Sequence, residues 1–235
     1  MAHPAPGRDD RRVVDLDRPP FEGLTAGRVE AFSDAVLAIA ITLLVLQLDV
    51  GDGTGSLAHR LGDQWPVYLS YLLSFINIGI VWLNHHSVFS RLRGVDHGLV
   101  LLNLLLLLVV SVLPFPTKVL GDALQGADFA DHRTAALLYA GNFVAAASAF
   151  CALWLWASHG RRLIRDEVCD EGIRLRTRRM VIAIPAFAIP CVVAVWSPIS
   201  AIAIDGAIMV SFLLSDGWLE RRIGALDAAV ARRLK

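Results

Sequence analysis

Six long apolar stretches dominate this sequence of 235 residues and confine most charged side chains to the tails and loops. About 20 apolar residues in a helix cross the hydrocarbon core of a bilayer, because a helix rises about 1.5 Å per residue. Together, the six stretches make the chain too apolar for a water-soluble fold. The sequence therefore predicts an all-α integral membrane protein with six transmembrane helices. We place these helices at residues 31–50, 65–89, 96–119, 134–159, 178–197 and 198–217.

The distribution of basic residues predicts how the chain crosses the membrane. Nineteen of the 22 lysine and arginine side chains fall on one side of the predicted helices, and Arg60, Lys118 and Arg133 fall on the other. By the positive-inside rule both termini lie in the cytoplasm, which agrees with an even number of helices. The formal net charge is zero. Without a basic face that neutralises phosphates, we expect no nucleic-acid binding.

The helices form one domain between two tails. Residues 1–27 are rich in Pro, Gly, Arg and Asp, which predicts a flexible cytoplasmic tail. Residues 28–219 form the six-helix domain, and residues 220–235 form a basic cytoplasmic C-terminal tail. Cys151, Cys169 and Cys191 contain no CxxC pair, so we expect free thiols and no metal site built on them.

The first helix has two distinct faces. Bulky residues at helical spacing form one stripe: Phe32, Val36, Ile39, Leu43, Leu46 and Val50. Small residues form the neighbouring face: Ala31, Ala35, Ala38, Thr42 and Val45. Small residues let membrane helices approach closely. On periodicity alone, both faces are also consistent with ordinary helix packing.

Polar residues gather at the cytoplasmic ends of the first two helices. Arg28, Ser33 and Asp34 are on the first helix, and Asn84, His85 and His86 are on the second. An unpaired carboxylate in the membrane costs about 2.5 to 3.5 kcal/mol, so we expect Arg28 or a histidine to pair with Asp34. Two alternatives are a metal site of Asp34 with both histidines, which adjacent helical histidines rarely form, and simple interfacial hydrogen bonding.

Three further carboxylates lie near or within the membrane. Asp205 falls inside the sixth helix, where it could face water, pair across helices or be neutral. Asp49 and Asp52 follow the first helix and could concentrate cations at a pore entrance.

The first half of the chain contains several short motifs: Arg28, Phe32-Ser33-Asp34, the apolar run at 38–46, Trp82-Leu-Asn84-His85-His86 and Leu113-Pro-Phe-Pro-Thr117. Together these motifs resemble the transmembrane protein 175 family of potassium channels, in its bacterial single-repeat form. The resemblance covers residues 28 to about 120. It implies a bacterial-type plasma (inner) membrane protein, a homotetramer that conducts K⁺ passively through a central pore lined by the first helix.

The same resemblance assigns roles to particular residues. The family lacks the TVGYG filter, as does this sequence, and its apolar rings map onto Ile39, Leu43 and Leu46. Ile39 is the nearest of the three to Asp34, and for that reason we expect it to be the leading gate. Ala38 and Thr42 are secondary candidates for pore lining or packing. The resemblance implies that the polar motif residues couple the first helix to its neighbours: Arg28, Phe32, Ser33, Asp34, Asn84, His85 and His86.

Two other functional classes compete with a channel. An ion- or proton-coupled secondary transporter is the main alternative, although the sequence shows neither repeated halves nor broken helices around a midplane site. An enzyme would need a nucleophile or metal constellation that this sequence does not supply. We therefore expect a channel that requires no cofactor besides the permeant ion.

Overall fold

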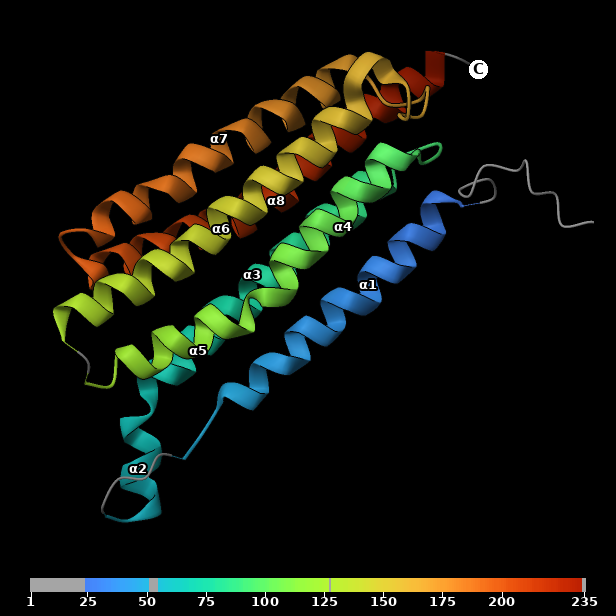
Figure 1. Ribbon diagram of the computed structural model, residues 1–235. Helices are drawn as coiled ribbons and strands as arrows, with labels where there is room; N and C mark the ends of the chain where they lie inside the picture. Colours follow the sequence, from blue (N-terminus) through green and yellow to red (C-terminus); the bar gives the residue numbers. More distant parts are fainter. Residues whose placement is uncertain (1–23, 51–54, 127, 234–235) are drawn as a thin grey trace, which may run out of the picture.

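The computed structural model describes residues 24–50, 55–126 and 128–233. Over these ranges the regular structure is helical, and the only β-type pairing is an isolated bridge between Leu92 and Ile164. Six helical spans are long and apolar enough to cross a membrane. The long helices run side by side along one common direction, and the short helix at residues 57–63 projects from one end of the bundle at an angle to them (Figure 1). The predicted all-α fold with six membrane-spanning helices is confirmed.

The elements follow the order of the predicted spans, with one addition between the first two. They are α1 (Ala26–Leu43), η1 (Leu44–Gln47), α2 (Leu57–Asp63), α3 (Trp65–Phe89), α4 (His97–Val112), α5 (Pro114–Ala123), α6 (Phe129–Ser158), η2 (His159–Arg161), α7 (Asp170–Ala194) and α8 (Pro198–Arg233). The short helix α2 was not predicted, because its seven residues are too few to give a membrane-length apolar signal.

Several boundaries differ from the prediction for identifiable reasons. The third span is broken at Leu113, because Pro114 lacks the N–H that would continue the hydrogen-bond ladder, and its second part, α5, continues to Ala123. α7 begins within the basic segment at Asp170. α8 continues to Arg233, so most of the segment 220–235 is helical. Of the tail 1–27, residues 1–23 lie outside the described residues.

Side-chain caps explain where several helices begin. The hydroxyl of Thr25 accepts a hydrogen bond from the backbone N–H of Arg28 at 3.3 Å, which starts α1. The carboxylate of Asp96 accepts from the N–H of Leu99 at 2.8 Å, which starts α4. Such caps satisfy backbone donors that have no partner inside the helix.

The arrangement places α1 and α7 at opposite edges of the bundle. α1 packs on α3 and α4, whereas α6 lies centrally and packs on α4, α5, α7 and α8. Figure 1 shows α7 and α1 on opposite sides of the bundle, with α3, α4 and α6 between them. The core around α6 contains the buried side chains of Tyr139, Phe143 and Trp154. The Trp154 indole N–H donates to the hydroxyl of Thr177 at 2.8 Å, which ties α6 to α7.

At one end of the bundle the segment after α3 is bound to the segment between η2 and α7. We call this end, which holds most of the basic residues, the basic end. Arg93 donates to the backbone oxygen of Arg162, and Arg165 donates to that of Leu92. Asp96 accepts from the indole N–H of Trp156 at 2.9 Å and forms an ion pair with Arg162 at 3.0 Å. These contacts fix the start of α4 against the end of α6.

Acidification is expected to loosen this attachment. Partial burial alone would raise the pKa of Asp96, but hydrogen bonds from Leu99 and Trp156 and the charge of Arg162 outweigh it and lower the pKa. A lowered pKa stabilises the fold above the pKa of the unfolded carboxyl, about 4, and this contribution is lost as pH falls through the folded-state pKa. We expect it to be at most about 1 kcal/mol, because the carboxylate is partly exposed.

Hydrogen exchange of residues 91–97 and 159–165 in the purified protein, measured as a function of pH, tests this expectation. Asp96→Asn keeps a residue that caps helices well but removes the charge, so its acid-induced change in protection should be smaller. Asp166→Asn, at an exposed carboxylate 3.8 Å from Arg93, is the control. An equal acid response in the wild type and in Asp96→Asn would contradict the assignment.

Candidate functional site

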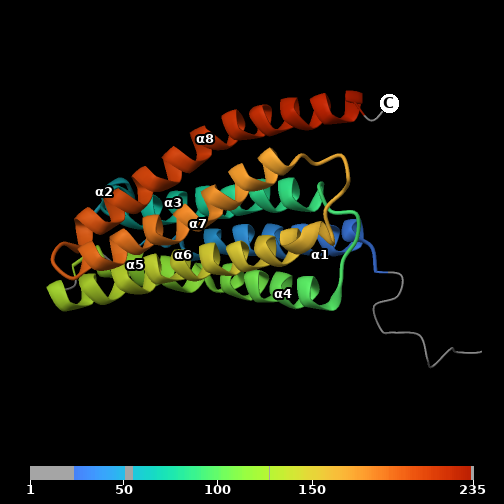
Figure 2. The same ribbon diagram turned by 90° about the horizontal axis from the view of Figure 1, so that it is seen from above.

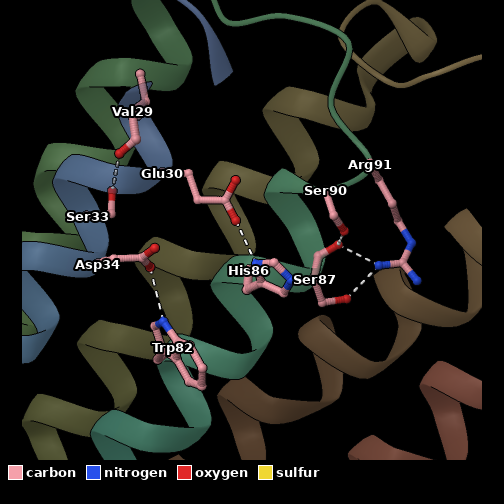
Figure 3. A network of polar contacts seen from close by, with 9 residues as sticks. All are labelled: Val29, Glu30, Ser33, Asp34, Trp82, His86, Ser87, Ser90 and Arg91. Atoms are coloured by element: carbon pink, nitrogen blue, oxygen red, sulfur yellow. Dashed lines mark hydrogen bonds and ion pairs between the residues drawn. The ribbon is translucent and has the colours of Figure 1, made fainter. Parts of the chain in front are cut away.

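The polar ends of α1 and α3 face each other at the basic end of the bundle. Figure 3 shows Asp34 of α1 beside Trp82 of α3, and Glu30 of α1 beside His86 of α3. The Trp82 indole N–H donates to the Asp34 carboxylate at 3.0 Å, and His86 Nδ1 lies 2.7 Å from Glu30 Oε1. Two side-chain contacts one helical turn apart therefore set the register of α1 against α3.

A second, buried layer joins α1, α3 and α4. Ser33, His85 and Asn103 are each at most 1% exposed. The amide nitrogen of Asn103 donates to Ser33 Oγ at 2.9 Å, and His85 Nε2 lies 2.9 Å from Asn103 Oδ1. The amide oxygen is an acceptor, so this contact assigns the proton to His85 Nε2. We call these three residues the buried triad.

Two of the triad residues also make contacts within their own helices, whereas the buried Nδ1 of His85 has no hydrogen-bond partner among the described residues. Ser33 donates its own proton to the backbone oxygen of Val29 at 2.8 Å, and the His85 ring stacks on Phe89 with centroids 4.2 Å apart. In hydrocarbon an unsatisfied polar group is expensive, so hydrogen-bonded groups of this kind hold membrane helices in one arrangement. The triad fixes α1 to two neighbours at once.

The structure brings most of the predicted motif residues together, but some of their partners differ from those we expected. We expected Arg28 or a histidine to pair with Asp34, and this expectation is wrong, because Trp82 donates to the Asp34 carboxylate. Arg28 is exposed, and its side chain takes part in no hydrogen bond or ion pair found among the described residues. Phe32 is also exposed, and Asn84 donates to the backbone oxygen of Ile80 at 2.9 Å.

A metal site of Asp34, His85 and His86 receives no support from this geometry. The two imidazoles engage different residues, Asn103 and Glu30. No group of three potential metal-ligating side chains occurs among the described residues.

Asn103 and Glu30 were missed by the sequence analysis. Asn103 lies in the leucine-rich run of α4, and a lone amide in such a run was itself a signal that a buried partner exists. Trp82 belonged to the motif but was not assigned a role.

The row of apolar residues on α1 faces away from the rest of the chain. Ile39, Leu43 and Leu46 are 59%, 40% and 73% exposed. The face that packs within the chain is a different one, formed by Val29, Ser33, Leu37, Ala40 and Leu44. Most of the bulky stripe and the whole small face predicted from the sequence are thus left uncovered by this chain.

The end of α1 differs from the predicted helix 31–50. The α-helix ends at Leu43 and a 3₁₀ turn covers Leu44–Gln47. Residues three apart lie above one another in a 3₁₀ turn, so Leu46 stays close to the line of Leu43 despite the change of pitch. Ala38 and Thr42 are exposed on the same helix, and the Thr42 hydroxyl donates to the backbone oxygen of Ile39 at 2.8 Å.

The other predicted carboxylates lie outside this site. Asp205 of α8 is 1% exposed, which excludes a position facing open water in the single chain, and its Oδ1 has no hydrogen-bond partner among the described residues. Asp49 accepts from the backbone N–H of Val50 at 2.6 Å. Asp52 lies outside the described residues. No disulfide joins Cys151, Cys169 and Cys191, and the Sγ of Cys169 accepts a hydrogen bond from the backbone N–H of Gly172 at 3.2 Å.

Comparisons with known proteins match the part of the chain that contains this site. The family described as "Endosomal/lysosomal potassium channel TMEM175" matches residues 28–114, which include the buried triad and the apolar row. A potassium channel of Chamaesiphon minutus is 44% identical over 157 residues, which cover 65% of this chain and 76% of that protein. The chain belongs to the TMEM175 family. The family resemblance predicted from the motifs is confirmed.

Two further comparisons show how far the TMEM175 similarity extends. A potassium channel of Streptomyces collinus is 54% identical over 131 residues, 55% of this chain, and the match spans 63% of that relative's length. The crystal structure of a lysosomal potassium-selective channel TMEM175 homolog from Chamaesiphon minutus matches with a TM-score of 0.72 at 34% identity, covering 81% of this chain and 97% of that chain. The TMEM175 fold thus includes the later helices, where the sequence motifs carried little information.

Proposed function

We propose that this chain is one subunit of a K⁺-selective channel, a homotetramer that conducts passively through a central pore lined by α1. The constriction consists of fourfold rings of Ile39, Leu43 and Leu46. Residues 28–219 form the channel domain, in a bacterial-type plasma membrane with both termini in the cytoplasm. The observation that carries this proposal is the uncovered apolar row on a helix at the edge of the bundle.

Subunit association accounts for both uncovered faces of α1. One apolar row cannot enclose a path for ions, whereas several copies of it around an axis can. The small face beside it, which includes Ala35 and Ala38, lets the neighbouring copy approach closely. Lipid alone could cover the row, but the relatives from Streptomyces and Chamaesiphon are potassium channels. An axial position for α1 fits both facts.

An apolar constriction discriminates between ions through their hydration. A bare ion in a dry apolar ring costs on the order of tens of kcal/mol, so a conducting ion keeps part of its water shell. K⁺ gives up water more easily than Na⁺, which favours K⁺ without carbonyl ligands. A narrow apolar ring also closes by losing its water, so a small movement of α1 is sufficient to gate it.

In this mechanism, the contacts between α1, α3 and α4 couple the pore-lining helix to its neighbours. Trp82 holds Asp34, and the buried triad holds Ser33, one to two turns from Ile39. A displacement of α3 or α4 is therefore transmitted to the constriction. In this role the polar motif couples helices and does not bind the permeant ion.

Planar-bilayer recording of the purified full-length protein tests the proposal. We expect unitary currents that reverse near the K⁺ equilibrium potential when K⁺ and Na⁺ are placed on opposite sides. Bilayers that receive a mock purification are the control. Saturable flux without unitary currents would instead identify a secondary transporter.

A further inference from the structure

A groove lies between α7 and α8 at the basic end, on the edge of the bundle opposite α1. Its cavity has a volume of about 270 Å³. Figure 2 shows α7 and α8 running side by side here. The groove is lined by Leu175, Arg178, Arg179, Ile182, Ser211 and Ser215. It therefore combines two guanidinium groups, two hydroxyls and an apolar floor.

The arginines near this groove differ in how they are held. Arg174 pairs with Glu171 at 2.7 Å. Arg179 donates to the backbone oxygen of Phe212 at 2.9 Å and lies 5.0 Å from the centre of the Phe212 ring. Arg178 is exposed, and no ion pair is found for it among the described side chains. Among the side chains at the groove that the structure describes, its guanidinium is the cation with no carboxylate beside it and is the one that can contact an external anion.

The apolar part of the groove extends toward the middle of the membrane. Ile182 lies one turn along α7 from Arg178, and Ile189 lies two turns further on the same side of the helix. Both isoleucines are about half exposed. A basic and hydroxyl-bearing end followed by a strip of exposed apolar surface matches a phospholipid, whose charged headgroup is joined to acyl chains.

We propose that this groove binds a phospholipid with an anionic headgroup, drawn from the leaflet at the basic end. The phosphate contacts Arg178 and the hydroxyl of Ser211, and an acyl chain lies along Ile182 and Ile189. Basic groups at the surface of a membrane attract anionic lipids, and pockets between transmembrane helices hold their headgroups. That this edge faces lipid rests on the proposed axial position of α1, because α7 then lies on the outside of the tetramer.

Lipid titration of the purified full-length protein, followed by native mass spectrometry, tests this site. We expect phosphatidylglycerol to bind more tightly than phosphatidylcholine. Arg178→Gln should weaken phosphatidylglycerol binding about fivefold, the effect of one basic residue near a membrane surface, and leave phosphatidylcholine binding unchanged. Arg178→Lys keeps the charge and should retain most of the binding.

Arg174→Gln is the matched control, because it makes the same change one turn away at a guanidinium already paired with Glu171. Equal losses in both glutamine variants would mean that only diffuse surface charge acts and would overturn the site. Displacement of the lipid by inorganic phosphate at equal concentration would identify a free-anion site and also overturn it. K⁺ currents are recorded separately, so missing lipid binding with intact currents rejects only this inference, and missing currents with intact lipid binding reject only the proposed function.

Discussion

Replacing Leu43 with alanine is expected to raise the unitary K⁺ conductance about threefold to tenfold and to lower the preference for K⁺ over Na⁺. In the proposed tetramer the change replaces four isobutyl groups with methyl groups in one ring of the constriction. A wider ring lets an ion keep more of its water, and a barrier lower by about 1.4 kcal/mol corresponds to a tenfold faster passage. The measurement is single-channel recording with K⁺ on one side and Na⁺ on the other.

Val192→Ala is the control for this experiment. Val192 is also an exposed apolar residue of a membrane-spanning helix, but it lies on α7, at the edge of the bundle opposite α1. Its conductance and reversal potential should remain close to those of the wild type. Ile39→Asn, which makes the proposed gate polar, should hold the ring hydrated and also increase the current. If unit currents and reversal potentials are unchanged at both ring positions, the constriction is not formed by this row.

Hydrophobic length predicted the number of spans better than it predicted their ends. α3 begins and ends where the sequence analysis placed it, because polar and apolar residues change sharply at Trp65 and after Phe89. α7 begins earlier than the apolar signal, since a helix continues into water where its side chains are charged. Hydropathy reports where a helix meets lipid, whereas hydrogen bonds and caps decide where the helix begins.

In the site, the sequence predicted several of the residues but not the partners that they contact in the fold. Ser33, Asp34 and His85 were identified from their positions in motifs, but their partners come from α3 and α4, which only the fold brings close. Asn103 had no motif around it. The exposure of Ile39 and Leu43 could not be predicted either, because periodicity gives the faces of a helix without showing which face is covered by its own chain.

Asn103→Leu is expected to destabilise the folded chain by about 2 to 3 kcal/mol and to abolish normal gating. The substitution nearly conserves volume, so it removes hydrogen bonds without leaving a large cavity. Both partners, Ser33 Oγ and His85 Nε2, lose their bond to the amide. Leaving a buried polar group unsatisfied costs about 1 to 3 kcal/mol, although an interhelical hydrogen bond in a membrane protein averages only about 0.6 kcal/mol.

Thermal unfolding of the purified protein measures the loss, and Asn142→Leu supplies the control. Asn142 also makes a hydrogen bond between two helices, donating to the backbone oxygen of Val109 at 3.0 Å, but its Oδ1 has no hydrogen-bond partner among the described residues. Asn142→Leu should therefore reduce the free energy of unfolding by less than Asn103→Leu does. In the Asn103→Leu background, Ser33→Ala should cost less than it does in the wild type, because the bond between the two residues is already lost. Additive losses would mean that Ser33 and Asn103 stabilise α1 independently, and α1 would then not be coupled to α4 through this hydrogen bond.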